Sequence, residues 1–395
     1  MKGTCIKKRL IRLAAAAMAA ITMLTTLSFS ASAKTVDTKY GTIEIQSSSW
    51  MASLPDDTKI NEMSIPGAHD ATTRNVDYCM EVFAQTQDRY IKDLLEIGVR
   101  YFDLRICRDK DTLYMCHQSV DCYDSDDYRL RLSDVIYDMK VFLNQHPSET
   151  ILLQVKCDRT ENDAENETWK YFKNMAEKGE LYCGDHAPTL GEARGKFLLL
   201  NRLNFGENTQ FDKYVNVRED GSYSCWGLDV HDFHGGNTTD KTMELTSKNT
   251  ELGYYVWTED MYNVPKEEKW DYVWNSLLGS CNAAYRRDEA RKMGCDAFNI
   301  IYASMSYQNW VRVALEVINP LVDLVDTIID KEGMVWPKEA AYSINPKLRE
   351  LLEKNTNLYT GCLVCDYIDS FLARAIYMTN FDVPADSMVQ YGGSW

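Results

Sequence analysis

A histidine and a carboxylate lie side by side at His69 and Asp70, directly after a short apolar segment. We expect Met63–Ile65 to end a strand, and Pro66 and Gly67 to break it and turn the chain sharply. In α/β barrels, catalytic side chains come from the C-terminal ends of several strands. A histidine in a turn is often only structural, so a chemical role for His69 requires partners elsewhere in the chain.

Such partners occur in the next predicted hairpin. Val99–Cys107 is predicted to be a strand in which Asp103 and Arg105, two residues apart, lie on one face. A turn and a second strand, Thr112–His117, follow. This hairpin takes Arg105 and His117 toward one end of a sheet.

Other polar side chains share a position at or near the end of a predicted strand: Lys156, Arg202, Asp260 and Asp366. Strand ends are exposed, which explains several polar residues there. Exposure alone does not explain why two histidines, which can exchange a proton near neutral pH, occur there together with an arginine on the strand that leads to one of them.

Two histidines and a cation suit the cleavage of a phosphodiester by an internal hydroxyl. One imidazole removes the hydroxyl proton, and the other protonates the leaving oxygen. A guanidinium neutralises the non-bridging oxygens, where negative charge is concentrated. A carboxylate behind the basic histidine fixes its tautomer.

Strands that alternate with helices predict a parallel α/β barrel. Strands are expected at Thr150–Lys156, Lys196–Arg202, Tyr223–Val230, Gly253–Thr258, Ala297–Ser304 and Leu358–Tyr367, and helices at Leu132–Gln145, Glu161–Lys178, Pro265–Leu278, Asn309–Asp330, Pro346–Lys354 and Ser370–Met378. No repeat or linker divides the chain. We therefore expect one barrel over residues 61–380, with a lead-in at 34–60 and a tail at 381–395.

Residues 1–33 have a basic head, an apolar run and an Ala31-Ser32-Ala33 cleavage signal. This pattern predicts a secretory signal peptide and an extracellular protein, and a membrane anchor is the less favoured alternative. The full chain has a formal charge of −16. Because phosphate backbones require clustered lysine and arginine, this balance argues against a nucleic-acid partner.

Cysteine and histidine spacing gives no second site. Of twelve cysteines, Cys5 leaves with the signal peptide, so an odd number remains and the pairing stays open. Cys362 and Cys365 have the spacing of a metal or redox pair, but three residues apart on a strand they face opposite ways, which favours core packing. His231 and His234 lie in a Gly-Asn-Thr loop without a third ligand nearby.

Eight motifs occur in order: SIPGAHDATT, GVRYFDLRI, LYMCHQ, HPSETILLQVK, GKFLLLNR, EDMY, SINPKLRELL and LVCDYID. From about Asn61 to about Leu372 the chain resembles the bacterial phosphatidylinositol-specific phospholipases C. The resemblance implies an irregular, incompletely closed TIM-type barrel. It also implies a lyase that converts phosphatidylinositol to diacylglycerol and inositol 1,2-cyclic phosphate.

By this resemblance, His69 is the general base, oriented by Asp366. His117 is the general acid toward the diacylglycerol oxygen, assisted by Asp70, and Arg105 binds the phosphate. The resemblance assigns the substrate-binding positions to Asp103 beside Arg105, to Lys156, Arg202 and Asp260 on the inositol hydroxyls, and to Tyr262 against the sugar ring.

Some related enzymes use calcium, held by acidic residues and by an asparagine after the first histidine. This chain has Asp70 at the asparagine position, Arg105 on the strand that would carry ligands, and Lys156 where a glutamate would serve. Because these cations would repel the ion, we predict an enzyme without metal or other cofactor. Gln118 departs from the family, which usually has glycine after the acid histidine.

A bilayer substrate requires apolar residues at the membrane interface. Trp50–Met51, Trp226, Trp310 and Trp336 are candidates, although each also fits the core. We expect a monomer. Two other functions stay open: a metal-dependent glycerophosphodiester phosphodiesterase and a non-catalytic lipid-binding barrel. The sequence does not separate free lipid from glycan-linked anchors as substrate.

Overall fold

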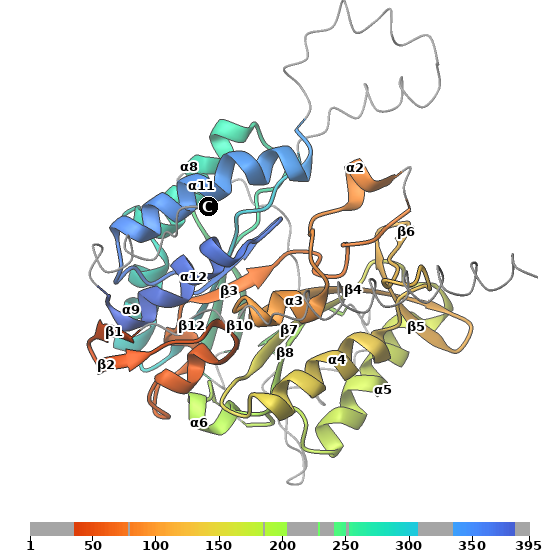
Figure 1. Ribbon diagram of the computed structural model, residues 1–395, viewed down its shortest axis with the longest axis horizontal. Helices are drawn as coiled ribbons and strands as arrows, with labels where there is room; N and C mark the ends of the chain where they lie inside the picture. The colour runs from red at the N-terminus through yellow and green to blue at the C-terminus, as the bar shows by residue number, and fades with distance from the viewer. Residues whose placement is uncertain are drawn as a thin grey trace, which may run out of the picture.

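The computed structural model describes residues 35–77, 80–184, 186–203, 228–229, 241–249, 253–306 and 335–383. The predicted signal peptide, the helix at Asn309–Asp330, the tail beyond residue 383, His231, His234, Trp226 and Trp310 lie outside these residues. Within them the chain alternates strands and helices around one large curved sheet (Figure 1).

The sheet has a parallel centre. Its hydrogen-bonded path runs β10 (Glu244–Asn249), β11 (Tyr254–Glu259), β12 (Asp296–Tyr302), β13 (Cys362–Cys365), β3 (Ile65–Ala68), β4 (Tyr101–Asp109), β7 (Ile151–Cys157), β8 (Phe197–Asn201) and β9 (Leu228–Asp229). The two ends of this path, β9 and β10, lie near each other. No hydrogen-bonded pairing joins them within the described residues, as expected for an irregular, incompletely closed TIM-type barrel.

Helices cover the outside of the sheet. They are α3 (Ile91–Glu96), α4 (Leu132–Gln145), α5 (Ala164–Glu177), α8 (Lys266–Leu278), α9 (Ala283–Lys292), α11 (Pro337–Lys354) and α12 (Ser370–Met378), with short α2 (Glu81–Ala84) and α6 (Leu190–Ala193). Neighbouring residues of one strand enter different cores: Ile151 and Leu153 pack in the cluster that includes the helices, and Leu152 packs in the second cluster. Strands buried on both faces therefore read as continuous apolar runs.

The predicted hairpin is confirmed. β4 pairs antiparallel with β5 (Thr112–His117), which then pairs with β6 (Val120–Asp121). The predicted bounds of α4 and of α12 also hold. Cys362 and Cys365 are buried in different clusters, as predicted for core residues on opposite faces of a strand.

Two expectations about proline were wrong. Pro66 and Gly67 do not end a strand, because both lie inside β3. The ladder with β4 begins only at Gly67, so the missing N–H of Pro66 breaks no bond there. Pro346 does not begin a helix but lies inside α11, where the buried side chains of Ala340 and Ile344 belong to the preceding turns.

Trp50 and Met51 are wrong as candidates for membrane contact, because both are fully buried in η1 (Ser47–Ser53). The Trp50 ring stacks on Tyr377 at 5.4 Å between centroids, and its Nε1 donates to the Gly98 carbonyl at 2.9 Å. η1 follows a small hairpin of β1 (Thr35–Thr38) and β2 (Gly41–Glu44). The lead-in is thus packed into the core.

Candidate active site

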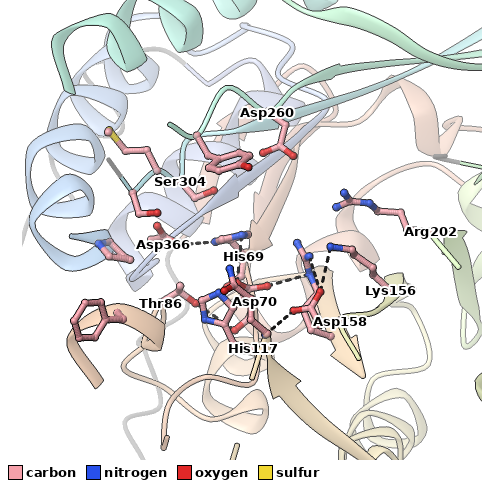
Figure 2. A pocket seen from close by; sticks show the side chains of 17 residues that line it. His69, Asp70, Thr86, His117, Lys156, Asp158, Arg202, Asp260, Ser304 and Asp366 are labelled. Atoms are coloured by element: carbon pink, nitrogen blue, oxygen red, sulfur yellow. Dashed lines mark hydrogen bonds and ion pairs between the residues drawn. The ribbon is translucent and has the colours of Figure 1, made fainter. Parts of the chain in front are cut away.

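A cavity of about 220 Å³ opens at the C-terminal ends of the strands (Figure 2). Of the ten residues that the sequence singles out, all but Asp103 line it, and Asp103 lies directly behind Arg105. The lining residues are His69, Asp70, Phe83, Thr86, Arg105, His117, Gln118, Lys156, Asp158, Arg202, Asp260, Tyr262, Ser304, Met305, Ser306, Pro337 and Asp366.

His69 follows β3, and Asp366 follows the neighbouring parallel strand β13. The pairing of Ala68 with Cys365 sets the next residue of each strand side by side. Asp366 Oδ1 lies 2.8 Å from His69 Nδ1. Because a carboxylate accepts, Nδ1 carries the proton, and the lone pair of neutral His69 lies on Nε2.

His117 ends β5, and its two ring nitrogens contact the Ala84 carbonyl and the Asp70 carboxylate. Its Nδ1 donates to the Ala84 carbonyl at 3.0 Å. Asp70 Oδ2 lies 3.4 Å from His117 Nε2 and 3.5 Å from His69 Nε2. The two Nε2 atoms are therefore no further apart than the sum of these distances, and one small group can contact both.

Arg105 projects from β4 between carboxylates. Its Nε and Nη2 donate to the two oxygens of Asp103 at 2.8 and 2.7 Å, and Nε also lies 3.0 Å from Asp70 Oδ1. Burial by itself raises the pKa of Asp103, but the Arg105 guanidinium outweighs it and holds that pKa below its usual value. Arg105 is a fixed guanidinium facing the two imidazoles.

The same carboxylates control His69. Burial lowers the pKa of an imidazole, but Asp70, Asp366 and Asp103 together raise the pKa of His69 to about 9. The carboxyl of Asp366 has a raised pKa because it is buried, and the His69 charge opposes this rise. His69 in the free site is thus a strong base that is mostly protonated at neutral pH.

Asp158 is a site residue that the sequence analysis missed. It follows β7 and is almost fully buried. Its carboxylate lies 3.4 Å from Arg105 Nη1 and 3.2 Å from Lys156 Nζ, and it accepts from the Gln118 backbone N–H at 2.8 Å. Burial opposes ionisation, but Arg105 and Lys156 lower the pKa of Asp158 to about 2. Its position two residues after Lys156 was the available signal.

The remaining polar residues come from the ends of other strands around the cavity. Asp260 and Ser304 come from the ends of β11 and β12, and Arg202 and Lys156 approach from β8 and β7 (Figure 2). Burial raises the pKa of Asp260, and Arg202 counteracts part of that rise. Tyr262 is half exposed at the rim.

Three non-glycine residues in or directly next to the site have left-handed backbone conformations. Asp70 has φ 40°, Gln118 has φ 50° and Tyr367 has φ 46°. Asp70 and Gln118 directly follow the two histidines, and Tyr367 directly follows Asp366. In each case the chain turns away from its strand at the functional side chain.

His69, Asp70 and Asp103 offer ligand atoms close enough together for a metal ion. However, Arg105 contacts both aspartates at 3.0 Å or less. A guanidinium already neutralises the charges that would attract a divalent cation, and it would repel one. This donor set therefore fits an arginine better than a metal.

The family model for the phosphatidylinositol-specific phospholipase C X domain matches residues 63–203. The sequence-based resemblance to the phosphatidylinositol-specific phospholipases C is confirmed by this match. The match spans β3 to the end of β8 and includes both histidines and Arg105. The sequence-based expectation of an enzyme of the phospholipase C family is confirmed.

Curated relatives extend the likeness beyond the X domain. A 1-phosphatidylinositol phosphodiesterase of Staphylococcus aureus strain Newman is 26% identical over 304 residues, which cover 73% of this chain and 89% of that protein. The Listeria monocytogenes protein of the same name is 32% identical over 181 residues, 44% of this chain and 53% of the relative.

Solved structures confirm the fold. A pentafluoro-Phe variant of the phosphatidylinositol-specific phospholipase C from S. aureus superposes with a TM-score of 0.60 at 22% identity, covering 84% of this chain and 97% of that chain. The Listeria monocytogenes enzyme gives 0.57 at 21% identity, covering 85% and 99%. Among the described residues, no helix has the length and apolar character needed to cross a bilayer.

Proposed function

We propose that this protein is a secreted phospholipase C that cleaves phosphatidylinositol to diacylglycerol and inositol 1,2-cyclic phosphate without a metal ion. The observation that carries the proposal is the position of two imidazole Nε2 atoms on either side of Asp70, with Arg105 beside them. The curated name of the relatives supports the same substrate.

In this mechanism, neutral His69 removes the proton of the inositol 2-hydroxyl through Nε2, while Asp366 holds its Nδ1–H. The alkoxide oxygen attacks phosphorus, and the bond to the diacylglycerol oxygen breaks. His117, doubly protonated, gives its Nε2 proton to that oxygen. Arg105 neutralises the non-bridging oxygens, which carry more charge in the transition state.

We assign the inositol ring to the polar residues that surround the rest of the cavity. Lys156, Arg202 and Asp260 offer charged groups to the ring hydroxyls, and half-exposed Tyr262 offers a face for stacking. A ring with hydroxyls on most of its carbons can meet several charged partners at once. Glycan-linked phosphatidylinositol anchors present the same ring and phosphate, and we include them as candidate substrates.

Phosphorus NMR of the products from phosphatidylinositol vesicles in EDTA tests the proposal. We expect the resonance of a five-membered cyclic phosphate to appear at the same rate with and without chelator. His69→Ala and His117→Ala should each lower that rate by at least about 10³-fold without loss of the folded state. Activity that disappears in EDTA and returns with calcium would instead support the metal-dependent alternative.

A further inference from the structure

A buried ion pair lies next to the cavity without lining it. Lys269, near the start of α8, places its Nζ at 2.9 Å from both carboxylate oxygens of Glu259, the last residue of β11. The two side chains are at most 1% exposed. Neither residue lines the cavity, and the mechanism above gives neither a role.

The Glu259 carboxylate also holds the backbone that follows β11. Its Oε1 accepts a further hydrogen bond, from the Met261 N–H at 2.9 Å. One residue later, the Tyr262 carbonyl accepts from the Ser306 N–H at 3.2 Å. Between these two bonds runs a short segment whose end residues, Asp260 and Tyr262, both line the cavity. The position of Glu259 therefore affects where both of these side chains lie.

Lys269 ties this carboxylate to a packed helix. On α8, Lys269 is buried together with Val273 and Leu277, so its backbone moves with the helix. Because one ammonium group contacts both oxygens and a backbone N–H contacts one of them, the Glu259 carboxylate is restrained in orientation as well as in position.

Stability alone does not account for such a pair. Removing two charges from water costs about as much free energy as their attraction returns, and apolar residues of similar size often stabilise a protein equally well. Apolar side chains at positions 259 and 269 could fill the same space. They could not supply an acceptor for the Met261 N–H, which is the contribution specific to Glu259.

We propose that Glu259 and Lys269 are positioning residues for substrate recognition, which hold Asp260 and Tyr262 where these side chains bind the inositol ring. The inference rests on the proposed function, which assigns the ring to this part of the cavity. The groups that would act on phosphorus come from β3, β4, β5 and β13 instead. Loss of the pair should therefore weaken binding of the ring more than it slows the chemical step.

The double variant Glu259→Met/Lys269→Met separates positioning from stability. It leaves no unpaired charge in the core, and it lacks the acceptor for the Met261 N–H. With a short-chain phosphatidylinositol below its micelle-forming concentration, we expect KM to rise about 10-fold while kcat changes by less than about threefold. Calorimetry with myo-inositol, which involves no turnover, should show a similar loss of affinity.

A second double variant, Glu259→Gln/Lys269→Met, restores the acceptor, because the glutamine oxygen can accept from the Met261 N–H. Its KM should return to within about threefold of the wild-type value. The matched control is the Arg100–Glu149 pair, which is equally buried with 2.9 Å between Nε and Oε2. This pair lies just before β4 and β7, at the edge of the sheet away from the cavity. Arg100→Met/Glu149→Met should leave KM unchanged whatever its effect on the Tm.

The inference fails if Glu259→Met/Lys269→Met is folded and has the KM and the myo-inositol affinity of the wild type, while the wild type cleaves the lipid. It also fails if KM rises equally in the Arg100–Glu149 control. Glu259→Leu/Lys269→Met carries the same test if the methionine variant does not fold. A wild-type protein that neither cleaves the lipid nor binds myo-inositol would instead overturn the proposed function, and with it the ring-binding role.

Discussion

Asp366 Oδ1 is hydrogen-bonded at 2.8 Å to Nδ1 of His69, the proposed general base. If neutral His69 is the base, kcat/KM should rise with pH until His69 loses its proton near pH 9. Asp366→Asn removes one of the charges that raise this pKa. We expect the rising limb of the kcat/KM profile to move to lower pH and its maximum to fall. A limb that keeps its position in the variant would assign it to another group.

Arg105 combines a charge with a planar pair of donors. Arg105→Lys keeps the charge but cannot hold both oxygens of Asp103 and also reach Asp70. We expect kcat to fall about 10²-fold while the Tm changes little. Arg108→Lys is the matched control, because Arg108 lies on the same strand, outside the cavity. Equal kcat values for both variants would show that Arg105 does not bind the phosphate.

Asp158 holds three groups at once: Arg105, Lys156 and the Gln118 backbone. Asp158→Asn preserves the size of the side chain and removes its charge, which leaves both cations less restrained. We expect kcat/KM to fall about 10-fold, in line with the loss of a charged hydrogen-bond partner. Asp109→Asn, a half-exposed change on β4, should leave kcat/KM unaltered. A full rate in Asp158→Asn would limit Asp158 to a structural role.

At the level of elements, the β4–β5 hairpin followed from the sequence because its turn and both alternating strands are local. The strand β3 did not, because its course through Pro66 and Gly67 depends on β13 and β4, which lie far along the chain. A side chain at Gly67 would meet Val364 and Tyr101 at about 3 Å, so glycine here allows close packing and does not mark a turn.

The segment η1 is a core element. Trp50→Phe removes the bond from Nε1 to the Gly98 carbonyl and part of the stacking on Tyr377. We expect the free energy of unfolding to fall by about 2 kcal/mol, measured by urea denaturation. Binding to phosphatidylinositol vesicles should be unchanged. If the variant instead keeps its stability and binds vesicles more weakly, Trp50 contacts the membrane and is not a core residue.

For the whole molecule, the sequence indicated which residue types meet at the sheet edge, since parallel strands end on one side. It did not indicate that a single Asp70 oxygen lies between both imidazoles, because that depends on the approach of β5 to β3. It also did not indicate the burial of Trp50, since an aromatic residue fits an interface and a core equally well.

Global stability should depend on pH through His69. Its pKa is raised from 6.5 to about 9 in the folded protein. This shift stabilises the folded protein by about 3 kcal/mol. The stabilisation is fully present below pH 6.5 and is lost as the pH rises through about 9. Urea denaturation of the wild type and of His69→Asn at pH 6 and pH 10 measures it. The wild type should lose more stability than the variant over this range, and parallel losses would contradict the shift.

The left-handed residues at positions 70, 118 and 367 have a consequence for the evolution of this protein. Each costs of the order of 1 kcal/mol relative to a relaxed backbone. Asp70 and Gln118 line the cavity, and Tyr367 directly follows Asp366, which also lines it. Selection for a more heat-resistant chain would therefore find easy gains at the rim, for example glycine at Gln118. The same changes would hold the functional side chains less rigidly. We therefore expect substitutions at this rim that raise thermal stability to lower the catalytic rate.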